Sequence, residues 1–331
     1  MRNVRVASVS FTGVGRFNTI RGTIEGNVRE MVKLLERVCI CDKPDIVCFP
    51  EHSPTIGLSL EDGVKTAEEN PGEIFSKIAP IAKKYGVYVV CPMYEKKNGH
   101  IYNAAVLIGR DGEYVGSYYK IHPTVDEIEG GITPGVEPKT FKTDFGTIGF
   151  AICFDLNFED VIKGSVENGA ELILFPTMYR GGLQLKIWAF KYGVYFASTF
   201  AGEGSMIVDP LGRTLAVSSM HSPIICKTIN LDYEILHIDY NWRKWDSIKE
   251  KYGPNVEIDV SSPEGVFMLI SNLKNVSVKD IIYEFQLETR KEYFHRSIKI
   301  REEALKKIRS GRTHLMNLPF FTSPSHESIK I

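Results

Sequence analysis

The chain has 331 residues, a formal net charge of −1 and a hydrophobic fraction of 43%. A charge balance this even gives no reason to expect nucleic acid or an anionic membrane as a partner. No apolar run approaches the roughly 18 residues that a membrane helix needs, so we expect a globular cytoplasmic protein with neither kind of partner.

Apolar periodicity predicts alternating strands and helices over the first two thirds of the chain. Strands are expected at residues 5–11, 45–49 and 87–91, helices at 27–39 and 73–85, and a hairpin around Asp111-Gly112. The plan then repeats, with strands at 146–154 and 171–178, helices at 160–168 and 183–195, and a hairpin at 202–219. The segments "PDIVCFPE" and "AELILFPTM" each end a strand in Phe-Pro, which indicates a weak internal duplication within a layered α/β sandwich.

The composition changes after Asp232, so we expect one domain at 1–232 and an extension at 233–331. A long helix is predicted from Ser277 to Arg309, with apolar side chains on several faces that need cover on more than one side. This predicts a homodimer or a larger homo-oligomer. The alternative is a monomer in which Phe320 and Phe321 of a loose tail fold back over the helix.

Six cysteines are present, and none of their spacings matches a zinc motif, so we expect no metal and no cofactor. Cys153 differs from the others because it lies at a joint between a predicted strand and a predicted helix. A helix N-terminus lowers a thiol pKa, and free backbone N–H groups, such as that of Phe154, can hold an oxyanion. The alternative is an inert cysteine buried at a strand end.

A reactive thiol needs a base and an electrostatic partner. Glu51 ends the strand "DIVCFP", at the carboxyl edge where α/β proteins place their sites. Lys120 ends the strand "YVGSYYK", where an ammonium could stabilise a tetrahedral intermediate. Taken singly, each is more often a solvated carboxylate or a surface lysine at a sheet edge.

Together, "FPE" with Glu51, "YYKIHP" with Lys120 and "ICFDLNFED" with Cys153 resemble the three signature segments of the nitrilase superfamily of carbon–nitrogen hydrolases. The resemblance implies a four-layer αββα sandwich, here with a C-terminal helical extension. It also implies that Glu51 is the general base, Lys120 the stabiliser of the intermediate and Cys153 the nucleophile. Glu129 resembles the additional active-site glutamate of this family, although Glu127 leaves that assignment open.

The residues after the nucleophile depart in part from the family pattern, with Asn157 where many members have arginine and Glu159-Asp160 where many have Pro-Glu. Phe154-Asp155 is similar to the amidase and carbamoylase branches rather than to true nitrilases. We therefore expect hydrolysis of a small amide or N-carbamoyl compound. Acyl transfer to an amine, nitrile hydrolysis and an inert interaction protein are the alternatives.

The substrate pocket is expected near the end of the "LFPT" strand. Tyr179 and Arg180 follow that strand, and Arg180 could bind a substrate carboxylate through two hydrogen bonds. The commoner role for such an arginine is an exposed loop residue. Substrate-binding roles are therefore predicted for Phe154, Tyr179 and Arg180, and the identity of the amide stays open.

Overall fold

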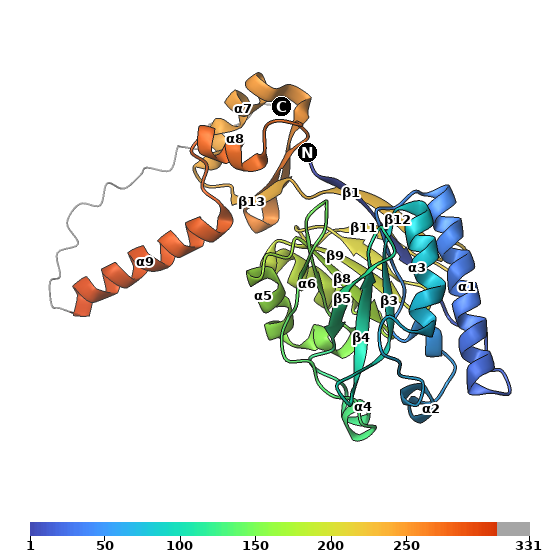
Figure 1. The fold of residues 1–331 in the computed structure, drawn as a ribbon. Coiled ribbons are helices and arrows are strands. Elements are labelled where there is room, and N and C mark those ends of the chain that lie inside the picture. Colours follow the sequence, from blue (N-terminus) through green and yellow to red (C-terminus); the bar gives the residue numbers. More distant parts are fainter. Residues whose placement is uncertain (310–331) are drawn as a thin grey trace.

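The computed structural model describes residues 1–309 (Figure 1). Two six-stranded sheets form its centre. The first has the order β12 (Ile224–Asn230), β1 (Asn3–Val9), β2 (Ile46–Cys48), β3 (Tyr88–Lys97), β4 (His100–Ile108), β5 (Tyr114–Tyr119). The second has the order β11 (Thr214–Val217), β10 (Met206–Val208), β9 (Tyr195–Phe200), β8 (Leu172–Thr177), β7 (Thr147–Phe150), β6 (Phe141–Lys142).

The same strand order occurs in both sheets. Strands β1, β2 and β3 run parallel and are followed by the antiparallel pair β4 and β5. Strands β7, β8 and β9 run parallel in the same way, followed by the antiparallel pair β10 and β11. The "VCFP" and "ILFP" segments lie at the ends of β2 and β8, the middle parallel strands of the two sheets. The internal duplication that the sequence indicates is therefore a repeat of the same strand order in each half.

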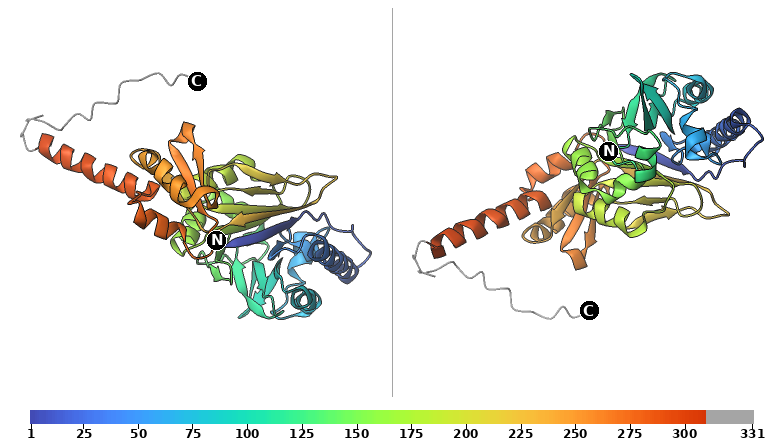
Figure 2. Two further views of the ribbon diagram at one scale, coloured as in Figure 1. Left: turned by 90° about the horizontal axis from the view of Figure 1, so that it is seen from above. Right: turned by 90° about the horizontal axis from the view of Figure 1, so that it is seen from below.

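Helices cover the outer face of each sheet, as Figures 1 and 2 show. Helices α1 (Ile20–Cys41) and α3 (Glu73–Tyr85) pack on the first sheet, and α5 (Glu159–Glu167) and α6 (Gly182–Tyr192) on the second. One apolar core lies between the sheets and another between the first sheet and its helices. The predicted αββα sandwich is therefore confirmed.

Three helix predictions needed correction. The helix predicted at 27–39 begins at Ile20, where the Thr19 side chain caps it, and runs to Cys41. The helix predicted at 183–195 ends at Tyr192, because Gly193 takes the left-handed conformation (φ 63°) and β9 begins at Tyr195. The long helix predicted from Ser277 to Arg309 is two helices, α8 (Val278–Glu284) and α9 (Arg290–Arg309). The chain turns at Gln286 (φ 50°), and the Thr289 side chain then accepts a hydrogen bond from the Glu292 N–H at the start of α9.

Residues 233–309 are not purely helical. They contain a three-stranded sheet in the order β13 (Tyr233–His237), β15 (Val266–Ser271), β14 (Val256–Ser261), together with α7 (Trp245–Tyr252), α8 and α9. This part has an apolar core of its own, and α9 projects away from the sandwich (Figure 2). Within residues 1–309, no helix is long and apolar enough to cross a membrane. The predicted tail contacts of Phe320 and Phe321 lie outside the described residues.

Candidate active site

Glu51 lies just past the carboxyl end of β2, in the middle of the first sheet, and its side chain is buried. Burial of a carboxylate is costly unless charged or hydrogen-bonding partners surround it. The Lys120 ammonium supplies one such partner, 2.9 Å from Glu51 Oε1. The amide Nδ2 of Asn103, on β4, donates a second hydrogen bond to the same oxygen at 2.8 Å. The carboxylate is thus held by two donors from the same sheet, one on β4 and one just after β5.

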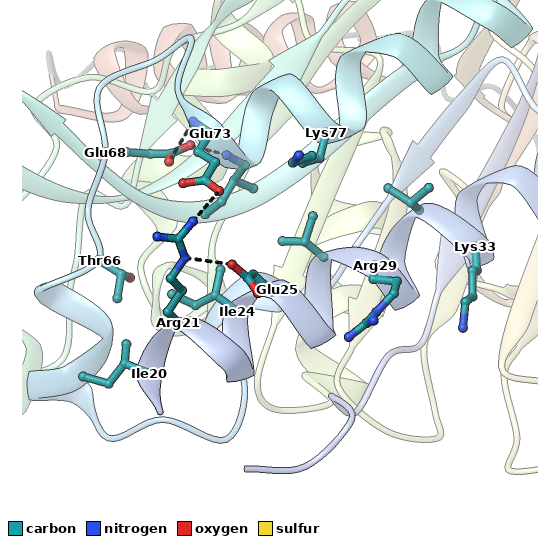
Figure 3. Close-up of a pocket in the computed structure, with 13 residues that line it drawn as sticks. Ile20, Arg21, Ile24, Glu25, Arg29, Lys33, Thr66, Glu68, Glu73 and Lys77 are labelled. Carbon is teal, nitrogen blue, oxygen red and sulfur yellow. Dashed lines mark hydrogen bonds and ion pairs between the residues drawn. The ribbon is translucent and has the colours of Figure 1, made fainter. Parts of the chain in front are cut away.

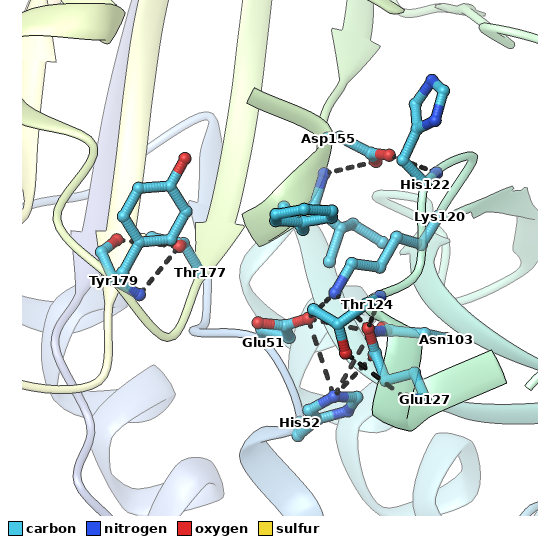
Figure 4. A network of polar contacts seen from close by, with 12 residues as sticks. Glu51, His52, Asn103, Lys120, His122, Thr124, Glu127, Asp155, Thr177 and Tyr179 are labelled. Atoms are coloured by element: carbon cyan, nitrogen blue, oxygen red, sulfur yellow. Dashed lines mark hydrogen bonds and ion pairs between the residues drawn. The ribbon is translucent and has the colours of Figure 1, made fainter. Parts of the chain in front are cut away.

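Lys120 follows β5 and is only 1% exposed. Its ammonium bridges two carboxylates, because Glu127 Oε2 lies 2.8 Å away on the other side from Glu51. Asn103 bridges the same pair, donating also to Glu127 Oε1 at 2.8 Å. Figure 4 shows this network, with the two glutamates joined through Lys120 and Asn103.

The second glutamate is Glu127 and not Glu129. Both lie on the short helix α4 (Val125–Glu129), but Glu127 is buried and Glu129 is exposed. Thr124 caps this helix: its hydroxyl accepts from the Glu127 N–H, and the Glu127 carboxylate accepts from the Thr124 N–H at 2.7 Å. The cap turns the Glu127 carboxylate toward Lys120. The placement of Glu129 in the site is therefore corrected in favour of the alternative that the sequence left open.

Cys153 begins the 3-10 helix η2 (Cys153–Asn157), after β7 of the second sheet. Its φ of 46° is left-handed, which is uncommon for a residue other than glycine and marks a tight turn under strain. Asp155 holds this turn through its buried carboxylate, which accepts from the Ile152 N–H at 2.9 Å and the His122 N–H at 2.8 Å. Since His122 follows Lys120 by two residues, Asp155 ties the cysteine turn to the segment that carries the lysine.

The charges of the site follow from burial and from these contacts. Burial raises the pKa of the Cys153 thiol to about 12, and the nearby Glu51 carboxylate adds to this rise. Burial alone would also raise the pKa of Glu51, but the Lys120 ammonium and His52 together outweigh it and hold that pKa below its ordinary value. Burial would lower the Lys120 pKa, but Glu51, the Cys153 sulfur and Glu127 together outweigh it, and the pKa is raised. At rest the site therefore holds a neutral thiol beside an ionised base and an ammonium.

The residues predicted to bind substrate lie in different settings. Phe154 is partly exposed, and its N–H lies in the first turn of η2, where N–H groups have no partner inside the helix. Tyr179 is half-buried, and its phenol pKa is raised to about 12 by burial and then by the Cys153 sulfur, which places it near the thiol. Arg180 is exposed, and its guanidinium lies 3.7 Å from the Glu203 carboxylate.

Glu51, His52 and Glu127 lie close enough together to raise the question of a metal ion. The ammonium of Lys120 already lies between the two carboxylates, at 2.9 and 2.8 Å. A metal cation there would meet this buried positive charge, so the cluster does not suit one. The carboxylates are neutralised by a cation that the chain itself supplies.

A hollow of about 900 Å³ between α1 and α3 offers a second place to look for a site (Figure 3). Its polar groups serve the fold: Arg21 pairs with Glu25 at 2.7 Å and faces Glu73 at 3.8 Å, and Glu68 accepts from the first N–H groups of α3. The lining contains no cysteine or histidine. This hollow is separate from the charged cluster, and its lining offers no thiol.

Comparison with known proteins agrees with this geometry. A sequence model of the carbon–nitrogen hydrolase family matches residues 5–235, which include the whole cluster around Cys153. The chain belongs to the carbon–nitrogen hydrolase family. The resemblance to the nitrilase superfamily drawn from three short segments is thereby confirmed, and this hydrolase contains all three of those segments at one end of its sandwich.

Relatives and solved structures add detail. The hydrolase is 27% identical to human omega-amidase NIT2 over 191 residues, which cover 50% of this chain and 69% of that protein. Its fold is similar to that of Nit3 from Saccharomyces cerevisiae, a member of branch 10 of the nitrilase superfamily, with a TM-score of 0.61, 20% identity, and coverage of 76% of this chain and 95% of that one. An amidase from Nesterenkonia sp. gives a TM-score of 0.61 at 18% identity, covering 75% and 96%.

Sequence reasoning missed His52, Asn103 and Asp155. No local pattern marks Asn103, which reaches the site only through the pairing of β3, β4 and β5. A signal for Glu127 was present, because Thr124 followed by Glu127 is the capping-box spacing, and a capping box points its glutamate back toward the start of the helix.

Proposed function

We propose that this hydrolase cleaves the C–N bond of a small amide or N-carbamoyl compound through a Cys153 acyl-enzyme, with Glu51 and Lys120 completing a catalytic triad. One observation carries the proposal: the buried Glu51 carboxylate is bound to the Lys120 ammonium, and its charge raises the pKa of the Cys153 thiol, which lies in a strained turn. A buried ion pair beside a cysteine contributes little to stability, so a role in chemistry accounts for it better.

In the first half-reaction Glu51 takes the thiol proton as the Cys153 sulfur attacks the carbonyl carbon. The carbonyl π electrons move to oxygen, and the resulting oxyanion is stabilised by the Lys120 ammonium and the Phe154 N–H. Glu51 then returns its proton to the nitrogen of the leaving group as the C–N bond breaks. Proton transfer of this kind contributes about 10²–10⁴-fold to a rate.

In the second half-reaction Glu51, again a carboxylate, takes a proton from water as the water oxygen attacks the thioester. Collapse of this intermediate expels the Cys153 sulfur, which recovers the proton from Glu51. The products are an acid and an amine, or ammonia where the substrate is a primary amide. The chain, the substrate and water supply every group in this balance.

The names of the relatives favour amides over nitriles as substrates, since NIT2 is an omega-amidase and the Nesterenkonia protein an amidase. We place Tyr179 in the wall of the acyl pocket, because it follows β8, the strand beside β7, and packs against the same core as Cys153. We place Arg180 at the rim, because it is exposed, and a substrate carboxylate there would have to displace Glu203.

A substrate panel tests the proposal directly. The wild-type chain and Cys153→Ala are incubated with short primary amides, amides that carry a second carboxylate, N-carbamoyl compounds and nitriles, and ammonia and acid are measured. We expect release from at least one amide or carbamoyl class in the wild type only. Turnover of nitriles alone, products that require an added amine as acceptor, or equal release by Cys153→Ala would each contradict the proposal.

We also propose that the protein forms a homo-oligomer in which α9 meets a second copy. The side chains of Phe294, Ile298 and Ile308 are at least half exposed on this projecting helix. With Leu305 they follow one another at intervals of four, seven and three residues, which places them along one side of the helix, as in the seam between two helices. Light scattering on Phe294→Glu/Ile298→Glu is expected to show a smaller mass than the wild type, with Val136→Glu, exposed on the sandwich, as the control. A wild-type mass near that of one 37.3 kDa chain would contradict the proposal.

A further inference from the structure

His52 has no role in the chemistry above, although it follows the proposed base directly. Neighbouring residues in an extended chain point to opposite faces. Here His52 takes the left-handed conformation, with φ 56° and ψ 24°, which returns its imidazole to the side of the Glu51 carboxylate. Histidine is among the residues enriched in this conformation, although it carries strain. The strained backbone at His52 thus brings its imidazole beside the Glu51 carboxylate.

The imidazole points one nitrogen at the charged pair. Nε2 of His52 lies 3.6 Å from Glu51 Oε1, 3.7 Å from Glu127 Oε1 and 3.3 Å from the Tyr94 hydroxyl. The ring stacks on Tyr94 of β3, with centroids 4.4 Å apart. In Figure 4 His52 approaches the two carboxylates from one side, while Lys120 approaches them from the other.

The partners of the two ring nitrogens indicate where the proton lies. Nδ1 is buried and has no hydrogen-bond partner among residues 1–309. A proton on Nδ1 would leave a buried N–H without an acceptor, whereas a proton on Nε2 faces two carboxylate oxygens. Asn103 Nδ2 lies 3.2 Å from Nε2 but gives both its hydrogens to the carboxylates, so it leaves the Nε2 proton to them. The tautomer protonated on Nε2 fits these surroundings.

We propose that His52 is a positioning residue that directs its Nε2 proton toward the Glu51–Glu127 carboxylate pair and so keeps Glu51 ionised until the thiol proton arrives. This inference rests on the proposed function of Glu51. Two carboxylates that share a site repel each other, and one of them tends to take up a proton. At 3.6 and 3.7 Å the contacts are electrostatic, and when Glu51 accepts the thiol proton, the Nε2 proton still faces the Glu127 carboxylate.

The surroundings of His52 allow a clean test. The titratable groups that face it are Glu51, Glu127 on α4, Lys120 after β5, Tyr94 on β3, and beyond them the Cys153 thiol. His52→Phe keeps a ring to stack on Tyr94 and removes both nitrogens. His52→Gln places an amide N–H near the position of Nε2. Tyr94→Phe removes only the hydroxyl that also contacts Nε2.

The readout is the pH dependence of Cys153 alkylation by iodoacetamide, followed by peptide mass spectrometry, with exposed Cys41 in the same sample as the reference thiol. It needs no substrate. Alkylation of Cys153 is expected to slow at low pH as Glu51 takes up a proton, and we call this part of the profile the acid limb. Losing the Nε2 proton in His52→Phe raises the pKa of the carboxylate pair, so the acid limb moves to higher pH, by on the order of one unit. His52→Gln is expected to recover part of this shift, and Tyr94→Phe to match the wild type. The Cys41 profile stays unchanged throughout.

Two results would overturn the inference: a His52→Phe limb that superimposes on the wild type, or a Tyr94→Phe limb displaced as far as that of His52→Phe. If His52→Phe fails to fold, His52→Asn replaces it, because asparagine accepts the left-handed conformation and its short amide does not reach the carboxylates. The proposed function fails differently, through a wild-type Cys153 that is unreactive or titrates as Cys41 does. A shifted limb in a chain that turns over none of the tested amides would reject the substrate class and leave the role of His52 standing.

Discussion

The two sheets share one topology, but the three proposed catalytic residues occupy only one set of the equivalent strand ends. Because Phe49-Pro50 and Phe175-Pro176 end equivalent strands, Thr177 of the second half matches Glu51. Ser8 pairs with Cys48 and Phe150 with Leu174, so three residues further on Phe11 matches Cys153. When the strand pairings are followed from β2 to β5 and from β8 to β11, Lys120 matches Met220. The carboxylate, the ammonium and the thiol of one set thus correspond to a hydroxyl, a thioether and a phenyl ring in the other.

This difference shows that the fold alone does not create the chemistry. Both halves offer strand ends at the same edge of the sandwich, but the buried ion pairs of Lys120 with Glu51 and Glu127 lie on the first sheet. The second sheet carries the Cys153 turn, whose buried Asp155 carboxylate accepts hydrogen bonds from uncharged donors. The Thr177 hydroxyl donates to the Tyr179 carbonyl at 2.7 Å (Figure 4). One wall of the site thus holds the buried ion pairs, and the other holds the thiol together with hydrogen-bonded side chains.

The largest effect is expected at the nucleophile. Cys153→Ala removes the sulfur and should abolish turnover while the fold persists, at a stability cost on the order of 1–2 kcal/mol. Intact-protein mass after incubation with substrate checks for an acyl adduct, which we expect in the wild type only. Cys226→Ala, at another half-buried cysteine, is the control and should retain full activity. Full activity of Cys153→Ala would end the covalent mechanism.

Lys120→Met gives the first half the residue that the second half has at Met220. Loss of the buried ammonium, like loss of the base in Glu51→Gln, is expected to lower kcat by at least about 10²-fold. Steady-state kinetics separate kcat from KM. A Lys120 variant that changes KM alone would move this lysine from catalysis to substrate binding.

Glu127→Gln and Glu129→Gln form a matched pair on one short helix. The first breaks a buried ion pair and should cost roughly 3 kcal/mol of stability together with much of the activity. The second, at an exposed position, should change stability by no more than about 0.5 kcal/mol. Chemical denaturation and steady-state rates measure both, and a stronger effect at Glu129 would reverse the assignment.

The loss of stability in Glu127→Gln is also expected to depend on pH, in a direction that the pKa of Glu127 determines. Burial would raise the pKa of its carboxyl, but His52 and then Lys120 outweigh burial and hold that pKa well below its usual range. A carboxyl whose pKa is lowered on folding stabilises the protein above the ordinary glutamate pKa and loses that contribution as pH falls. The stability gap between wild type and Glu127→Gln should therefore shrink on acidification. A gap that widened would contradict the charge assignment.

The smallest effect is expected at Tyr179, on the wall of the site that the second sheet forms. Tyr179→Phe removes one hydroxyl near the thiol and keeps the ring, so we expect KM to rise severalfold with kcat nearly unchanged, for a loss of about 1 kcal/mol in binding. Kinetics with two amides of different acyl length measure this change. A large fall in kcat would instead place the hydroxyl in the chemistry.

Short-range signals predicted much of the fold and singled out Glu51, Lys120 and Cys153 as candidates for one site. The helix Glu73–Tyr85 has the predicted bounds because its apolar spacing and its Gly86 cap are local signals. The turn at Asp111-Gly112 is also a local signal, and β4 and β5 flank it. Glu51, Lys120 and Cys153 are candidates because each lies at or near the end of a predicted strand.

The missed features depend on distant pairing or on single backbone angles. Asn103 looks like any polar residue in a strand until β4 is placed beside β5. The turn at Gln286 rests on one left-handed residue without glycine, so the helical pattern appeared to run on to Arg309. The sheet formed by β13, β14 and β15 was hidden because its strands are separated by α7 and by charged connections.

The position of β1 has a consequence for how the chain comes off the ribosome. Seven residues of β1, Asn3 to Val9, pair with β12, Asn230 to Ile224, across more than two hundred residues of sequence. Until β12 emerges, β1 is an open edge of the first sheet, and open edges attract foreign strands. Such distant pairing also slows folding. More than two hundred residues must therefore be synthesised after β1 before β12 can shield it, and β1 is exposed to aggregation during this interval.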